Sequence, residues 1–180
     1  MSASTSDAPS SGTQLRLRPP RHRVERRAIA HWTVRAALTA VPIAAVAVIG
    51  ATVAHLALPE QDWTGWLWVL AVVVALPPLL TMVIMPQWRY RVHRWEVTDD
   101  AVYTLAGWLW QEWRVAPMSR IQTVDTHRGP LQRAFGLSTV TVTTASAAGA
   151  LSIDGLDTER ATRVAEELTE VTQAIPGDAT

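Results

Sequence analysis

The dominant pattern in this chain is a pair of long apolar segments, residues 36–58 and 63–85, and neither contains Asp, Glu, Lys or Arg. At about 1.5 Å per residue, a helix over either segment would be about 34 Å long, enough to cross a hydrocarbon core of about 30 Å. Only residues 59–62 separate the two segments, so the second must return to the side where the first began. Two buried helices of a soluble core are the alternative, but a small protein cannot easily cover them. The pattern predicts a two-helix transmembrane hairpin.

After the hairpin the spacing of apolar residues changes to two, which is typical of strands. We expect six strands, a short helix and two turns: strands 89–98, 101–106, 108–116, 121–126, 138–144 and 150–153, helix 131–135, and turns 99–100 and 147–149. From Asp157 onward, apolar residues recur every three or four positions up to Val171, which predicts one amphipathic helix. The fold class is therefore a transmembrane hairpin followed by about six or seven antiparallel strands, forming an open barrel capped by a C-terminal helix.

These patterns divide the chain into four parts: a disordered Arg-rich N-terminus (1–33), the hairpin (34–86), the β-rich domain (87–175) and a short tail (176–180). Ser, Thr, Ala, Gly and Pro dominate the first 14 residues, which have no apolar periodicity. The first apolar segment is too long, and begins too far into the chain, to be a cleaved signal peptide.

Charge predicts how the hairpin is oriented. Seven Arg precede the first apolar segment and three follow the second within ten residues, whereas the connecting loop has only the acidic Glu60 and Asp62. The positive-inside rule therefore places both termini in the cytoplasm. Trp63, Trp66 and Trp68 fall near the outer end of the second segment, and Trp32, Trp88 and Tyr90 fall near the inner ends, as aromatic belts would.

The Arg cluster before the hairpin is the candidate lipid contact. Its members are Arg21, Arg23, Arg26 and Arg27. Each basic residue near an anionic membrane surface contributes about 1 kcal/mol to binding. The alternative interpretation is that these residues only set the topology.

Three tryptophans, Trp108, Trp110 and Trp113, are the candidate partner-binding surface. On a strand, Trp108 and Trp110 would share one face and Trp113 would lie on the other, so the three cannot all be buried or all be exposed. Trp is enriched at the energetic centres of protein interfaces. The alternative is that at least two of them pack in the core or against the bilayer.

A search for chemistry finds little. Asp125 and His127 would share one strand face, and His93 could meet His127 as half of a metal site, but no third ligand or nucleophile has suitable spacing. The chain has no cysteine. From residue 86 onward nine Arg face twelve acidic residues, which argues against nucleic-acid binding. We expect no enzyme activity, metal, cofactor or small-molecule substrate.

Two motifs carry a resemblance. The segments 117–125 (PMSRIQTVD) and 129–137 (GPLQRAFGL), followed by the strand at 139–142, resemble the YdbS-like bacterial PH-domain membrane proteins. The resemblance implies two transmembrane helices before a pleckstrin-homology (PH)-like cytoplasmic domain in a bacterial plasma membrane. The motif residues that we interpret as scaffold are Pro117, Arg120, Gln122, Gly129, Pro130, Leu131, Arg133, Phe135 and Gly136.

The leading functional hypothesis is a non-enzymatic inner-membrane protein whose PH-like domain mediates protein association, with itself or with a sister PH-domain membrane protein. One alternative is an accessory subunit of a transport, export or envelope-stress system, in which a helix bend at Pro77-Pro78 would matter. Another is an anionic-lipid-binding module. Phosphoinositide recognition is disfavoured, because the first predicted turn carries Asp99 and Asp100.

Overall fold

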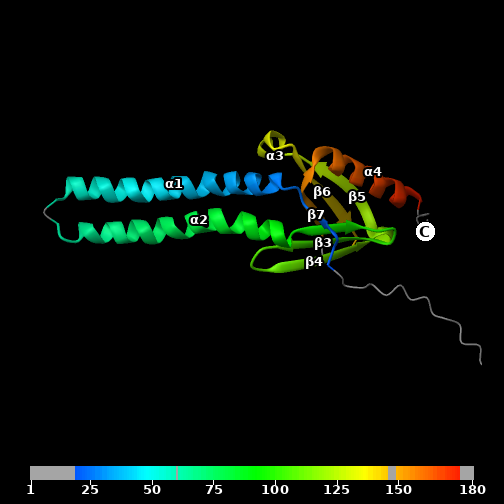
Figure 1. The fold of residues 1–180 in the computed structure, drawn as a ribbon, viewed down its shortest axis with the longest axis horizontal. Coiled ribbons are helices and arrows are strands. Elements are labelled where there is room, and N and C mark those ends of the chain that lie inside the picture. Colours follow the sequence, from blue (N-terminus) through cyan, green and yellow to red (C-terminus); the bar gives the residue numbers. More distant parts are fainter. Residues whose placement is uncertain (1–18, 60, 146–148, 175–180) are drawn as a thin grey trace, which may run out of the picture.

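The computed structural model describes residues 19–59, 61–145 and 149–174, so the expected tails and most of the turn at 147–149 lie outside the described residues. Two long helices run side by side and lead into a compact β-rich domain (Figure 1). The elements are β1 (His22–Arg23), α1 (Arg27–Ala57), α2 (Thr64–Val92), β2 (Arg94–Val97), β3 (Ala101–Gly107), β4 (Gln111–Pro117), η1 (Met118–Arg120), β5 (Ile121–His127), α3 (Pro130–Ala134), β6 (Leu137–Thr144), β7 (Leu151–Asp157) and α4 (Thr158–Ala174).

The helices α1 and α2 form the predicted hairpin. Only 11% of the most apolar window of each helix is buried inside the protein, which a core helix of a soluble protein would not show. The helices contact each other along small residues such as Ala40, Ala51, Ala71 and Ala75, which are buried. The helix α2 continues through Pro77 and Pro78.

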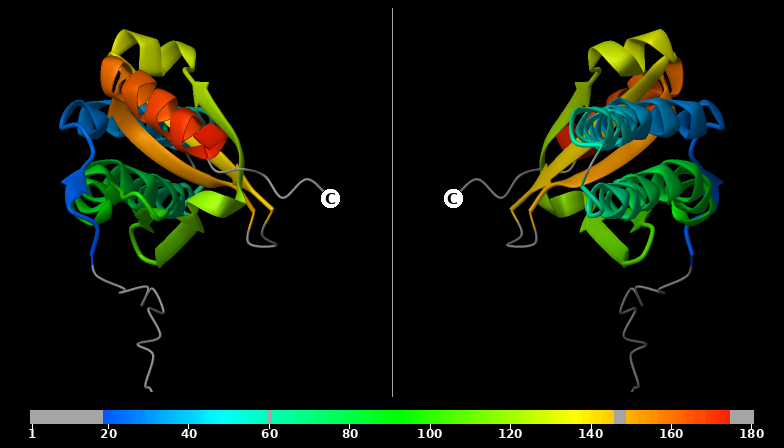
Figure 2. Two further views of the ribbon diagram at one scale, coloured as in Figure 1. Left: turned by 90° about the vertical axis from the view of Figure 1, so that its right-hand side faces the viewer. Right: turned by 90° about the vertical axis from the view of Figure 1, so that its left-hand side faces the viewer.

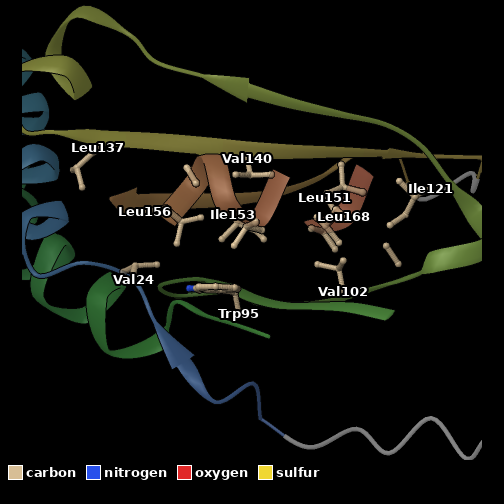
Figure 3. Packing of buried hydrophobic residues seen from close by; sticks show 14 of the residues in the cluster. Val24, Trp95, Val102, Ile121, Leu137, Val140, Leu151, Ile153, Leu156 and Leu168 are labelled. Atoms are coloured by element: carbon tan, nitrogen blue, oxygen red, sulfur yellow. The ribbon is translucent and has the colours of Figure 1, made fainter. Parts of the chain in front are cut away.

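The domain has two antiparallel sheets, with strand orders β1-β2-β3-β4 and β5-β6-β7. Side chains from the inner faces of both sheets meet in one core, in which Trp95 and Val102 face Val140, Ile153 and Leu156 (Figure 3). The helix α4 adds Ala161, Val164 and Leu168 to this core and lies across the β5-β6-β7 sheet (Figure 2). The predicted fold class is confirmed, including the capping helix.

Two sequence-based boundaries are wrong. The predicted strand 89–98 is helical as far as Val92, and only Arg94–Val97 is a strand. Tertiary contacts override the local alternation, because Tyr90 packs against the domain core and Arg89 forms an ion pair with β7. The predicted strand 108–116 begins only at Gln111.

The N-terminal segment also differs from the expectation of disorder up to residue 33. The strand β1 pairs with β2, and α1 begins at Arg27. Val24, Ala28 and Trp32 recur at intervals of four and are all buried in the domain core. Trp32 is 3% exposed, so it is a core residue and not a member of an aromatic belt at the membrane. The N-terminal end of α1 therefore belongs to the β-rich domain.

Candidate functional site

The best-organised polar cluster of the domain lies where the hairpin enters it. Six side chains form this cluster, which we call the junction. They come from α1, the C-terminal end of α2, α3, β6 and β7: Trp32, Arg89, His93, Gln132, Thr139 and Asp154. Arg89 lies only four residues after Met85, the last residue of the apolar segment. The junction therefore lies just beyond the apolar segments of the hairpin.

Arg89 is the centre of the junction. Its Nη2 donates to Oδ2 of Asp154 at 3.0 Å, and its guanidinium lies 4.5 Å from the centre of the Trp32 ring. The ion pair is partly buried, with the side chains 26% and 33% exposed. A partly buried, charge-assisted hydrogen bond that also stacks on an aromatic ring is stronger than an ordinary surface pair. It joins α2 to β7 through two residues that are 65 positions apart in the chain.

His93 caps the end of α2 in its neutral form. Its Nδ1 donates to the Arg89 carbonyl at 2.9 Å, and its Nε2 accepts from Nε of Arg89 at 3.2 Å. A protonated imidazole would have no acceptor nitrogen for that second bond. Burial, reinforced by the charge of Arg89, lowers the pKa of His93 to about 4. The ring therefore stays uncharged at neutral pH.

A chain of hydrogen bonds connects the junction to the second sequence motif. The Gly129 N–H donates to Gln132 Oε1 at 2.8 Å, and Gln132 Nε2 donates to Thr139 at 2.9 Å. The Thr139 hydroxyl in turn donates to Oδ1 of Asp154 at 3.1 Å. Residues of the second motif therefore orient the Asp154 carboxylate, which in turn binds Arg89 of α2. This gives the motif a structural role at the junction.

The first turns of α1 approach β7 closely on the other side of the junction. Gly155 has φ +73°, and a Cβ at this position would lie 2.9 Å from Cβ of Ala28. The Gly155 carbonyl accepts a hydrogen bond from Glu25 N–H at 3.0 Å. Only glycine combines this backbone conformation with such a close helix approach. Both hairpin helices are therefore fixed to the same strand.

Three clefts adjoin the junction; one, of about 520 Å³, lies between α1 and α2, and the other two reach strands of the domain. The cleft of about 500 Å³ is lined by Arg35, Arg89 and His127 together with Asp154 and polar residues of β6. Because Arg89 already pairs with Asp154, Arg35 is the residue of this cleft that could accept an anionic group. The other, of about 400 Å³, lies between the end of α2 and the β3–β4 hairpin. His93 lines the cleft of about 400 Å³ and His127 the cleft of about 500 Å³, and among the described residues no hydrogen bond or ring contact joins them. Among the described residues, no group of three or more His, Asp or Glu could hold a metal ion.

The three candidate tryptophans separate into two locations. Trp108 and Trp110 lie in the connection between β3 and β4, not on a strand face as predicted, and Trp113 lies on β4. Trp108 is partly buried, whereas Trp110 is 88% and Trp113 is 41% exposed.

The Arg candidates for lipid contact lie against the domain. Arg21 contacts Glu96, and Arg27 forms an ion pair with Asp157, while Arg23 and Arg26 are exposed. Ala36 is nine positions after Arg27, which is about 14 Å along the helix axis. Two of the four Arg side chains, Arg21 and Arg27, thus pair with carboxylates of the domain, at a level before the apolar segment begins.

The motif residues lie at the ends of elements, on α3 and on the surface, and none of them is buried. Pro130 is the first residue of α3 after the N-cap Gly129, and Phe135 contacts the ring of His31 with 6.1 Å between centres. Gly136 has φ +64° and adjoins Arg27. Pro117 ends β4, Gln122 is exposed on β5, and Leu131 lines the cleft of about 500 Å³ beside Arg35. Arg120 and Arg133 are exposed, and in the described part of the chain their side chains have no ion pair or hydrogen bond.

Sequence reasoning missed the junction. Its residues come from five elements, and the ion pair at its centre has no local signature. The one available signal is the spacing of Arg89 and His93, which fits one face of a helix, but the alternation of residues 89–98 predicts a strand there.

Comparison with known proteins agrees with this architecture. The family model described as "Bacterial PH domain" matches residues 34–172. The chain is 32% identical to the transmembrane protein YdbS of Bacillus subtilis (strain 168) over 117 residues, covering 64% of this chain and 72% of that protein. No solved structure gives a significant match. This membrane protein therefore belongs to the bacterial PH-domain family and is a homologue of YdbS.

Proposed function

We propose that this protein is a non-enzymatic membrane anchor whose PH-like domain associates with another protein in the same membrane, either a second copy or a sister PH-domain protein. The observation that carries the proposal is the outer face of the β1–β4 sheet. Its β3–β4 half carries apolar side chains that are not members of the core cluster, next to the charged Arg94 and Glu96 of β2. Among these apolar residues Leu105 is only 7% exposed, whereas Trp113 is 41% exposed.

The register of the sheet defines this surface. Leu105 is opposite Trp113 and Tyr103 is opposite Val115, so the four side chains share one face. Trp95, Val102 and Ala116, which alternate with them, point into the core. We call Tyr103, Leu105, Trp113 and Val115 the outer apolar face.

The second sheet provides an internal comparison. On its outer face Thr123 is opposite Thr143 and Asp125 is opposite Thr141, so this face is polar, as expected for the solvated side of an antiparallel sheet. The outer apolar face lacks that pattern and presents a partly exposed Trp, the residue type most enriched at interface centres. This contrast supports association through the β1–β4 sheet.

The way the domain is attached also supports a partner in the same membrane. The strands β3 and β4 run roughly along the direction of the hairpin helices, whereas β5–β7 are inclined to it (Figure 1). The face of the β1–β4 sheet therefore points sideways, parallel to the membrane plane. The junction fixes this orientation through α1, α2 and β7. A neighbouring membrane protein could therefore meet the outer apolar face by lateral diffusion.

The proposal includes the location. The Arg residues before residue 36 and after residue 85, against an acidic connecting loop, support a plasma-membrane protein with the domain and both termini in the cytoplasm. A reporter fused to either end, active only in the cytoplasm, tests this orientation independently of association.

The association is tested by site-specific photocrosslinking in native membranes. A photoreactive phenylalanine analogue replaces Trp113 in one variant and the exposed Thr123 of the polar face in the matched control. We expect a discrete crosslinked product, a homodimer or one partner, from position 113 and none from position 123. No product from position 113, or equal products from both positions, would contradict the proposal.

Anionic-lipid binding is a second candidate, favoured by the cleft that Arg35 and Arg89 line at the membrane boundary. Arg35 has no ion pair in the described part of the chain, so its charge is available. If the cleft holds a lipid phosphate, Arg35→Gln should reduce co-purification of anionic lipid, while Arg133→Gln, an exposed change on α3, should not. Equal lipid content in both variants would exclude this candidate.

A further inference from the structure

We infer that the tip of the β3–β4 hairpin, Trp108-Leu109-Trp110, inserts into the membrane leaflet nearest the domain and forms a third attachment point besides α1 and α2. The inference does not depend on which leaflet this is, and it concerns a different surface from the outer apolar face. It rests on the depth of the tip, its chemistry and its defined shape.

The depth follows from shared neighbours. Trp108 lines the same cleft as Met85 and Arg89 of α2. Met85 is the last residue of the apolar segment, and Trp88, which is 50% exposed, follows it at the level of an interfacial aromatic belt. Figure 1 shows the β3–β4 hairpin pointing back toward the membrane helices, beside the end of α2. The tip therefore lies at head-group depth.

The chemistry of the tip fits this depth. Leu109 is 70% and Trp110 is 88% exposed, the highest values for large apolar side chains in the domain. No charged residue occurs between Asp100 and Glu112, over the whole of β3 and the tip. Trp side chains favour the membrane interface, and a Leu between them can reach the acyl chains. Water is a poor environment for this tip, whereas the adjacent lipid is a good one.

The shape of the tip is set by Gly107. This residue has φ +116°, and a Cβ there would lie 1.8 Å from the carbonyl oxygen of Trp110. The backbone thus closes tightly on itself and presents residues 108–110 as a compact apolar wedge at the end of two paired strands. A wedge on a paired hairpin keeps its position relative to the helices, because β3 also contacts α2.

A protein partner could in principle cover the same tip, but the position favours lipid. The opposite end of β3 begins at Ala101, after the acidic turn of Asp99 and Asp100, so the strand runs from a polar end to an apolar end as it approaches the membrane. At about 3.3 Å per residue the seven residues of β3 span about 20 Å between these ends. Polarity therefore changes along the strand in the direction expected for contact with a bilayer.

Single-cysteine labelling tests the inference directly, because the chain has no native cysteine. Leu109→Cys and the control Asp99→Cys are each labelled with an environment-sensitive fluorophore and placed, one chain per disc, in phosphatidylcholine–phosphatidylglycerol nanodiscs. Nanodiscs leave both leaflets accessible to solutes, and a single chain per disc removes self-association. Both positions are exposed, so neither change should affect folding, which an unchanged melting temperature would verify.

We expect the label at position 109 to emit at shorter wavelength, to be quenched by lipids that carry a spin label near the head group, and to be several-fold less sensitive to iodide than the label at position 99. Equal iodide sensitivity at both positions would overturn the inference. Protection at position 109 without quenching by the spin-labelled lipid would also overturn it, because it would indicate a protein contact instead.

Discussion

Replacing Asp154 by Asn should weaken the attachment of α2 to the domain. The change removes the ion pair with Arg89 at 3.0 Å and places an amide donor opposite a guanidinium donor. The hydrogen bond from Thr139 can persist, because the Asn carbonyl accepts it. The loss is therefore confined largely to the contact between α2 and β7.

The exposure of the pair sets the magnitude. Exposed ion pairs contribute about 0–1 kcal/mol, whereas breaking a fully buried pair costs about 3–5 kcal/mol. The two side chains are 26% and 33% exposed, which places the pair between these limits. We expect Asp154→Asn to lower the free energy of unfolding by about 2 kcal/mol, or the melting temperature by roughly 4–8 °C for a chain of this size.

The assay is unfolding in mild detergent, with a matched control. Glu112→Gln breaks the more exposed pair between Glu112 and Arg114, whose side chains are 62% and 33% exposed, and should cost less than about 1 kcal/mol. A double-mutant cycle with Arg89→Gln and Asp154→Asn isolates the pair, because the contacts of Arg89 with Trp32 and His93 are lost in both backgrounds. We expect a coupling energy of about 1–2 kcal/mol. A coupling near zero, or equal effects of Asp154→Asn and Glu112→Gln, would refute the central role of this pair.

Two further predictions concern the same region. The pKa of His93 falls from its ordinary 6.5 to about 4 in the folded protein, so between these values the unfolded chain binds the proton first. The free energy of unfolding should therefore decline by up to about 3 kcal/mol as the pH falls from about 7 to about 4. In melting curves, His93→Gln should remove most of this pH dependence. An unchanged pH dependence would contradict the buried neutral ring. Gly155→Ala should destabilise the fold by about 2 kcal/mol or more, since backbone strain adds to the close contact with Ala28. Gly149 has a similar φ of +78° but open space around it, so Gly149→Ala should cost about 1 kcal/mol of backbone strain alone. Equal losses in denaturant unfolding would argue against a close approach of α1 at Gly155.

The parts of the fold that the sequence predicts are those with many consistent residues in one segment. The two apolar segments, the β-branched run of β6 and the apolar stripe of α4 each carry their own signal, and the structure has all three. The predicted start of the strand at residue 89 is wrong, because the four alternating residues 89–92 fit a strand and a helix end almost equally well. Contacts with β7 and the core, which are distant in sequence, decide between them.

The site was less predictable than the fold for a related reason. Strand β1 has only two residues, so no periodicity can reveal it, and the burial of Val24 depends on sheets that form more than 70 residues later. The junction likewise joins residues whose types are ordinary by themselves. Arg89 looks like a topology signal and Asp154 looks like a surface carboxylate until the fold places them together.

The burial of Val24, Ala28 and Trp32 has a mechanical consequence for both proposed surfaces. Ala28 and Trp32 lie on α1 and Val24 lies just before it, so the domain core extends directly into the hairpin with no linker between them. The domain cannot tilt away from the membrane without exposing Trp32 and separating Arg89 from Asp154. The tip of the β3–β4 hairpin is consequently held at one depth and the outer apolar face at one height. For the proposed association, we therefore expect the partner to be a second membrane protein, which meets a face held at this height by lateral diffusion.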